Sequence, residues 1–155
     1  MADVLSQLEL LIMEWLAQSG YTGMFLSAFL AATLLPLGSE VVLTVLLINH
    51  FDPGITIAVA TAGNTLGSLV NYAAGFWGSL FLINRILKIK EAESVPALNR
   101  LKKYGAASLL FAWLPIIGDP LTFAAGILKI NLVLFLILVT AGKFIRYLVI
   151  GYAVL

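Results

Sequence analysis

Four ionisable side chains lie within otherwise apolar stretches of this sequence, and their types indicate the chemistry to expect. They are the acids Glu40 and Asp119 and the bases Lys143 and Arg146. A carboxylate can take up and release a proton, whereas lysine and arginine can bind phosphate, arginine through a fork that matches phosphate geometry. Inside a membrane each charge would cost about 2.5–3.5 kcal/mol on insertion scales. We therefore expect the acids to pair with the bases, either along a substrate or proton path or as a purely structural network.

Each acid follows a proline by four residues, with a glycine in between. The predicted hairpin-tip residues are Pro36, Gly38 and Ser39 in the first copy and Pro115, Gly118 and Pro120 in the second. Proline interrupts a helix, and irregular backbone at membrane depth is tolerated only inside protein or beside a water-filled cavity. The motifs therefore predict two re-entrant hairpins whose tips meet. We also expect Asp119 to be the N-cap of the helix that follows it, and Ser39 and Glu40 to cap the second arm of the first hairpin.

The two proline motifs belong to a longer internal match. A shift of 79 residues without gaps takes Pro36 onto Pro115, and it also takes residues 61–63 onto residues 140–142, both of which read Thr-Ala-Gly. Two matches in one register predict an internal repeat.

The composition is that of an integral membrane protein. The chain of 155 residues is 61% hydrophobic with a mean hydropathy of +1.04, well above the roughly 45–50% apolar content of soluble domains. It has no cysteine and one histidine, His50, which we expect in an interfacial turn. The sequence therefore predicts no metal site, no catalytic residue and no cofactor. The net charge of +1 points to no particular partner, and we expect no nucleic-acid partner.

We expect one all-α membrane domain, residues 1–155, built as an inverted repeat of a re-entrant helical hairpin followed by a transmembrane helix. Its predicted elements are an N-terminal amphipathic interfacial helix at 1–20, a re-entrant hairpin at 22–49, a transmembrane helix at 55–83, a cytoplasmic basic loop at 84–103, a second re-entrant hairpin at 104–130 and a transmembrane helix at 131–154. Each hairpin arm has about a dozen residues, too few for a span of about 20. The N-terminus lacks the positive region of a secretory signal, so we expect it to be retained.

The distribution of positive charge predicts the topology. The segment 84–103 holds six of the nine lysines and arginines, and none precedes it. By the positive-inside rule this loop is cytoplasmic, as a simple topological anchor or as a binding site for anionic lipid. The two hairpins then enter from opposite sides and both chain termini lie outside. Such inverted halves are typical of secondary transporters.

A stripe of small and polar residues runs along the segment 55–83. Gly63, Gly67, Asn71 and Gly75 follow one another at steps of four residues. The first two form a GxxxG pair, which allows close helix approach. We expect the pair to pack against the hairpins of the chain itself; the alternative is the face of a homodimer. Asn64 and Asn71 are then expected to line a cavity or to form hydrogen bonds between helices.

At these residues the chain resembles the DedA superfamily, also called the SNARE-associated or VTT domain, and within it the short YqaA-like branch. The similarity rests on residues 31–36 with Glu40, residues 63–67, residues 101–105, residues 113–115 with Asp119, and residues 142–143 with Arg146 and Tyr147. Together these segments cover nearly the whole chain after the first helix.

The resemblance implies a membrane protein with two opposed re-entrant hairpins. Members are linked to the movement of lipids between leaflets, undecaprenyl phosphate in bacteria and phospholipids in eukaryotic relatives, and proton coupling is proposed for several. The functional acid of the family's first hairpin falls on Glu40. The better-known branch carries arginines on both sides of the second-hairpin proline, where this chain has Ala112 and Gly118.

Taken together, these features predict a transporter or lipid translocase of the bacterial inner membrane. The resemblance implies that it moves a polyprenyl phosphate or a phospholipid, with proton coupling as proposed for several members. Its expected partners are membrane lipids, including lipid-linked phosphate. The predicted substrate or proton path consists of Glu40, Asp119, Lys143, Arg146, Asn64 and Asn71. The alternative is a membrane scaffold or assembly factor without transport activity. An intramembrane aspartyl protease is disfavoured, because Ile116 stands where its motif has a glycine and the Pro-Ala-Leu sequence at 96–98 falls in the polar loop.

Overall fold

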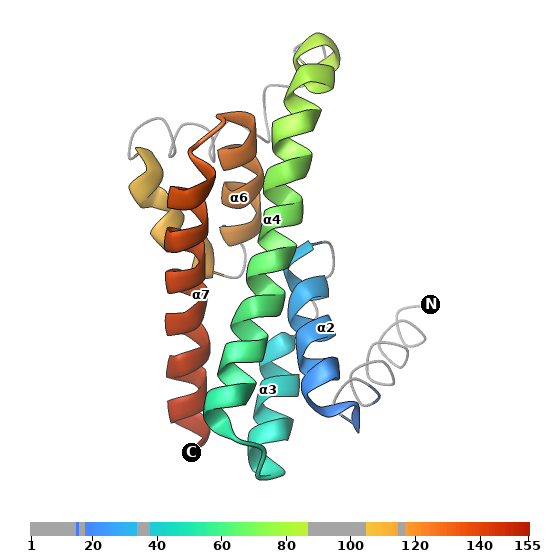
Figure 1. The fold of residues 1–155 in the computed structure, drawn as a ribbon, viewed down its shortest axis with the longest axis vertical. Helices are drawn as coiled ribbons and strands as arrows, with labels where there is room; N and C mark the ends of the chain where they lie inside the picture. Colours follow the sequence, from blue (N-terminus) through green and yellow to red (C-terminus); the bar gives the residue numbers. More distant parts are fainter. Residues whose placement is uncertain (1–14, 16–17, 34–37, 87–104, 115–116) are drawn as a thin grey trace. The chain divides into compact units, whose positions relative to one another are not determined.

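The computed structural model describes residues 15, 18–33, 38–86, 105–114 and 117–155, and every regular element in them is a helix. In chain order these are α2 (Gly20–Thr33), α3 (Ser39–Ile48), α4 (Pro53–Ile86), the 3₁₀ helix η1 (Gly105–Trp113), α6 (Gly118–Ile127) and α7 (Leu132–Val154) (Figure 1). The predicted all-α class is confirmed for this part of the chain. The chain divides into two compact units: unit 1 comprises Met1–Gly67 and Phe144–Leu155, and unit 2 comprises Ser68–Lys143.

The 79-residue shift found in the sequence also relates the helix boundaries. It takes both ends of α3 onto those of α6, and the first residue of α4 onto the first residue of α7. The helices α3 and α6 also end in the same way. Just after each helix the chain has a non-glycine residue with positive φ, His50 at 62° and Lys129 at 52°, and the described part has no others. Asp52 and Asn131 then cap the next helix: Oδ1 of Asp52 accepts one backbone N–H hydrogen bond, and Oδ1 of Asn131 accepts two. The internal repeat is therefore present in the local structure.

In unit 1, helix α2 packs directly against the first part of α4. A Cβ atom at Gly63 would overlap the carbonyl oxygen of Phe25, and one at Gly67 would overlap that of Phe29. The glycine pair therefore serves packing against the first hairpin of this chain, as expected, and α2 fills the face that a GxxxG dimer would use. The apolar core of unit 1 consists of Met24, Ala28, Val42, Leu43, Leu46, Leu47, Ile57, Ala60 and Tyr147.

In unit 2, the second part of α4 packs equally closely against α6. A Cβ atom at Gly75 would overlap the carbonyl oxygen of Phe123, and one at Gly126 would overlap that of Tyr72. The Tyr72 hydroxyl donates a hydrogen bond to the carbonyl oxygen of Ile130, just past the end of α6. The core of unit 2 consists of Tyr72, Leu109, Ala112, Leu121, Ala124, Ala125, Phe135 and Val139. The stripe along α4 thus meets a hairpin helix within each unit.

Helix length separates the elements that can cross a bilayer from those that cannot. α2 has 14 residues and α3 and α6 have 10 each, so they rise about 21 and 15 Å against a hydrocarbon core of about 30 Å. In the described part, α7 with 23 residues is the helix long and apolar enough to span. α4 has 34 residues, but Asn64 and Asn71 lower its apolar content, so the span predicted at 55–83 stays a prediction.

Helix α4 is longer than the span predicted within it, and other predictions fall outside the described residues. α4 is described from Pro53 to Ile86, which contains the whole of the span predicted at 55–83. Residues 1–14 of the predicted interfacial helix and residues 87–104, which hold most of the predicted basic loop, lie outside the described part.

Candidate functional site

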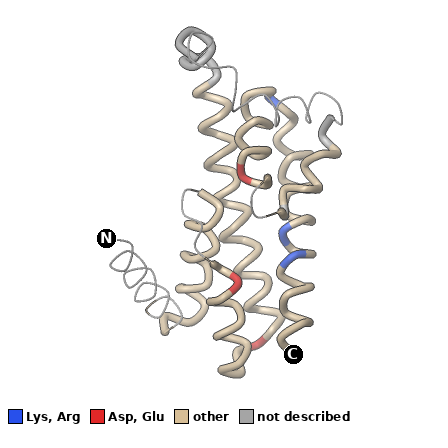
Figure 2. Tube along the Cα trace, turned by 180° about the vertical axis from the view of Figure 1, so that it is seen from behind, with Lys and Arg blue, Asp and Glu red and all other residues tan. Residues whose placement is uncertain are grey.

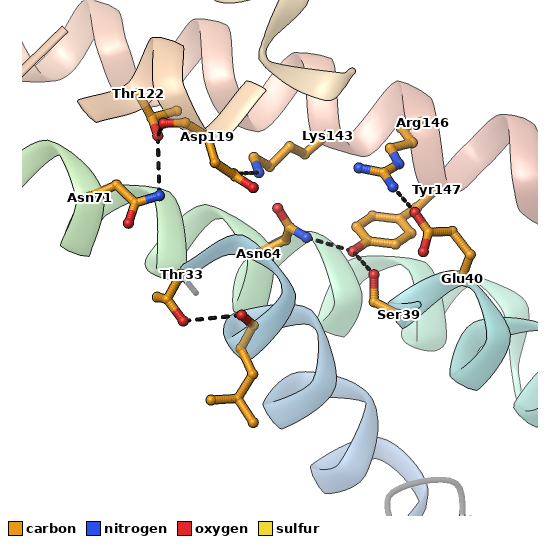
Figure 3. A network of polar contacts seen from close by, with 11 residues as sticks. Thr33, Ser39, Glu40, Asn64, Asn71, Asp119, Thr122, Lys143, Arg146 and Tyr147 are labelled. Atoms are coloured by element: carbon orange, nitrogen blue, oxygen red, sulfur yellow. Dashed lines mark hydrogen bonds and ion pairs between the residues drawn. The ribbon is translucent and has the colours of Figure 1, made fainter. Parts of the chain in front are cut away.

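The first acid pairs with α7 inside unit 1. Glu40 is the second residue of α3, and its carboxylate forms an ion pair with the guanidinium of Arg146 on α7 (Figure 3). The Glu40 side chain is 30% exposed and that of Arg146 is 16% exposed. The acid is therefore the more accessible member of this pair.

The second acid pairs with α7 inside unit 2. Asp119 is the second residue of α6, and its Oδ1 lies 3.8 Å from Nζ of Lys143 (Figure 3). The Lys143 side chain is only 2% exposed, whereas that of Asp119 is 35% exposed. A buried ammonium needs a counter-charge, because removing one partner of a buried pair leaves an uncompensated charge. Asp119 supplies that charge from the accessible side.

Both acids thus occupy the same position in their hairpins, and both bases come from one helix. The expectation that each hairpin acid faces a base of the last helix agrees with these two ion pairs. Apart from them, most of the described trace carries no charge (Figure 2). In each pair the side chain of the acid is more exposed than that of the base.

The helix capping predicted at the tips is wrong. α3 begins at Ser39 with Gly38 as its N-cap, α6 begins at Gly118 with Ile117 as its N-cap, and neither has a side-chain cap hydrogen bond. Asp119 lies in the first turn of α6 instead. The physical reason is competition for the side-chain oxygens, since the acids are engaged by bases of α7 and the Ser39 hydroxyl has its own partner.

Of the other predicted tip residues, two lie in the described part and two do not. Gly118 lies where the chain turns back on η1, because a Cβ atom there would overlap the carbonyl oxygen of Ala112. Pro120 is an exposed residue of the first turn of α6. Pro36 and Pro115 lie outside the described residues. The prediction that the two tips meet stays a prediction.

A buried hydrogen-bond network stands beside the Glu40–Arg146 pair in unit 1. The Nδ2 of Asn64 on α4 donates to the hydroxyl of Tyr147 at 2.8 Å, and that hydroxyl lies 2.9 Å from Oγ of Ser39 (Figure 3). Asn64 therefore forms the hydrogen bond between helices that the sequence predicted. Sequence reasoning does not include Tyr147 in the predicted path. A tyrosine next to Arg146 in an apolar segment is the signal that could have identified it.

Unit 2 also has a hydrogen bond from an asparagine of α4 to another helix, and it is longer than the one that Asn64 forms in unit 1. The Nδ2 of Asn71 on α4 donates to Oγ1 of Thr122 on α6 at 3.4 Å, and that hydroxyl donates to the carbonyl oxygen of Asp119 at 2.8 Å. Asn71 is thus also a hydrogen-bonding residue between helices. Thr122 was missed by sequence reasoning, because a threonine on a helix usually bonds its own backbone.

The described residues hold no group of three or more His, Cys, Asp or Glu side chains that could bind a metal ion.

Comparison with known proteins gives a consistent family assignment. The family model of the VTT domain matches residues 35–155. An uncharacterized protein of Haemophilus influenzae is 39% identical over 132 residues, which cover 80% of each chain. The inner membrane protein YqaA of Escherichia coli is 37% identical over 131 residues, 84% of this chain and 87% of the relative. An alkaline phosphatase-like protein of Lactococcus lactis subsp. cremoris is 30% identical over 148 residues, 87% of this chain and 69% of the relative. No solved structure matches the chain.

Proposed function

The chain belongs to the VTT-domain family of the DedA superfamily, a family of helical integral membrane proteins, and from that premise we propose that it is a proton-coupled lipid translocase of the bacterial inner membrane. Its substrate would be a lipid with a phosphate headgroup, either a polyprenyl phosphate or a phospholipid. The name of the Escherichia coli relative supports the inner membrane as its location.

The observation that carries this proposal is the presence of one acid–base pair in each unit, with the carboxylate more exposed than the base in both. Charges at membrane depth are expensive and mark substrate, ion or proton paths. A pair kept only for structure would gain nothing from an accessible acid, because exposure weakens its Coulomb energy. The exposure of both acids therefore favours a path over a static network.

The proposed mechanism follows from the charges. A proton taken up by Glu40 or Asp119 removes the negative charge that holds Arg146 or Lys143. The freed base then donates hydrogen bonds to the phosphate oxygens of a lipid headgroup. Loss of the proton restores the carboxylate. The carboxylate then forms its ion pair with the base again, and the base releases the headgroup. The cycle cleaves no bond of the lipid, forms and breaks one O–H bond of the carboxyl group, and moves one proton for each pair that opens.

The hairpins are proposed to be re-entrant and the two repeats to be inverted in the membrane. The lengths of α2, α3 and α6 support this arrangement, because none can cross a hydrocarbon core of about 30 Å. The concentration of basic residues in the segment between the repeats supports a cytoplasmic location for that segment.

The test is a proteoliposome assay with the full purified chain. Vesicles carry a labelled polyprenyl phosphate or a labelled phospholipid and an internal pH dye, so lipid movement and proton flux are measured together. Glu40→Gln and Asp119→Asn are each expected to slow lipid movement by about tenfold or more, equivalent to about 1.4 kcal/mol of lost stabilisation. Asp52→Asn is the matched control, because Asp52 caps α4 outside both pairs and asparagine caps equally well.

The pH dependence supplies a second measurement. Lipid movement is expected to increase as the pH falls on the side from which protons enter, because the cycle starts with a protonated carboxyl group. Glu40→Gln is expected to flatten this dependence, since an amide does not titrate. Unchanged transport in both amide variants would contradict the proposal.

The assay also separates the competing functions. A scaffold predicts no lipid movement by the wild-type chain, together with defects in folding or partner binding when the charges are neutralised. Mass spectrometry of the recovered lipid should find the phosphate ester intact. Release of inorganic phosphate would instead favour an enzyme, the class to which the name of the Lactococcus relative refers.

A further inference from the structure

We propose that Tyr147 is a positioning residue that fixes the Glu40–Arg146 pair, and that its hydroxyl does so through Ser39 and Asn64. The consequence for transport rests on the proposed function; the consequence for the geometry of the pair does not. All five residues belong to unit 1.

The first argument is adjacency on both helices. Ser39 and Glu40 are successive residues at the start of α3, and Arg146 and Tyr147 are successive residues on α7. One residue of each dipeptide forms the ion pair, and the other forms the contact of 2.9 Å between two hydroxyl groups (Figure 3). A rotation of α3 about its axis moves both side chains together, so the hydroxyl contact holds the direction in which Glu40 points.

The second argument is the contrast in burial. Tyr147 is completely buried, and Ser39 and Asn64 are buried with it, while both members of the ion pair remain partly exposed. Hydrogen bonds shielded from water are more costly to break than accessible ones. The buried contacts therefore stay closed while the neighbouring ion pair opens and closes, and they return Glu40 and Arg146 to the same geometry after each cycle.

The third argument is the hydrogen-bond capacity of a phenol. A tyrosine hydroxyl has one hydrogen to donate and accepts as well. It accepts a hydrogen bond from the Asn64 amide at 2.8 Å and lies 2.9 Å from Oγ of Ser39, a contact in which either hydroxyl can be the donor. The hydroxyl thus joins α3, α4 and α7 at one atom. Phenylalanine would retain the ring in the apolar core and lose all of these hydrogen bonds.

The decisive experiment is a double-mutant cycle on the free energy of unfolding of the full chain in detergent, which needs no transport activity. It combines Tyr147→Phe with Glu40→Gln. If Tyr147 positions Glu40, the effects are non-additive and the second substitution costs less once the first is present. Tyr152→Phe with Glu40→Gln is the control cycle, expected to be additive because the Tyr152 side chain is 80% exposed on the same helix.

Transport measurements then test the functional consequence. Tyr147→Phe is expected to raise the lipid concentration for half-maximal rate about threefold to tenfold, in the lower part of the range for residues of one network, and to shift the pH profile. Tyr152→Phe on the same helix is the matched control, because Tyr152 is 80% exposed, and it should behave as wild type. Ser39→Ala removes the same contact from its other side and should reproduce the shift if Tyr147→Phe folds poorly.

Each outcome decides one question. Additive effects of Tyr147→Phe and Glu40→Gln, or equal non-additivity in the control cycle, overturn the positioning role whether or not the chain transports lipid. A non-additive cycle with no lipid movement by the wild-type chain keeps the positioning role and rejects the proposed function. Equal shifts in Tyr147→Phe and Tyr152→Phe also overturn the proposal.

Discussion

Lys143 and Arg146 lie three residues apart on α7, and each forms an ion pair with the acid at the second position of a different hairpin helix. The two bases differ in chemistry. Arginine stays charged and offers a planar fork to a carboxylate or phosphate, whereas lysine is a point charge that can give up its proton when buried. The structure thus provides two similar pairs with different properties.

The buried lysine makes a prediction about stability. Asp119→Ala is expected to lower the free energy of unfolding by roughly 2–3 kcal/mol, slightly below the cost of breaking a fully buried pair, because Asp119 is partly exposed. The double variant Asp119→Leu with Lys143→Met should recover most of this loss, since no charge is left unpaired. Chemical unfolding in detergent measures both. A double variant less stable than Asp119→Ala would contradict the prediction.

The close approach of α2 to α4 makes a second prediction. Gly63→Ala and Gly67→Ala are each expected to destabilise the chain by about 1–3 kcal/mol, because the added methyl group would overlap a backbone carbonyl oxygen of α2. Ala62→Leu is the control, since residue 62 is exposed on the same helix. Thermal unfolding monitored with size-exclusion chromatography measures the effect. Unchanged stability with loss of a dimer would instead identify the glycine pair as a homodimer face.

The guanidinium fork makes a prediction about the substrate. Arg146→Lys keeps the positive charge but loses the two parallel hydrogen bonds to phosphate. We expect the lipid concentration for half-maximal rate to rise about tenfold, the cost of one charge-assisted hydrogen bond, while the maximal rate changes little. Lys129→Arg is the control, because Lys129 lies at an exposed helix end over the ring of Phe76. A fall in maximal rate alone would argue against headgroup binding by Arg146.

The repeat makes a prediction about topology that the chain is well suited to test, because it has no native cysteine. Asn49 and Leu128 are exposed residues at equivalent helix ends, related by the 79-residue shift. Single variants Asn49→Cys and Leu128→Cys are expected to react with an impermeant maleimide from opposite sides of the membrane. Labelling of intact and permeabilised spheroplasts distinguishes the sides. Labelling of both from one side would rule out inverted repeats.

Much of the fold follows from local sequence signals. The helices α3 and α6 lie within the predicted hairpins, because an apolar run after a proline and glycine break specifies where a helix begins. The glycine residues of the stripe on α4 predicted close helix packing, because glycine has no side chain to keep two helix backbones apart. The capping prediction for Asp119 was wrong because it considered only neighbouring residues. The competing partner, Lys143, lies 24 residues further along the chain.

By itself, the sequence determined the repeat, the breaks that make the hairpin helices short and the four charges that must be satisfied in an apolar chain. These are properties of residue type and spacing, which act over a few turns of helix. Only the tertiary structure decided which base each acid takes and that Tyr147 joins three helices at one hydroxyl. Such contacts depend on how helices far apart in the sequence rotate and approach one another, and that is set by packing rather than by any local pattern.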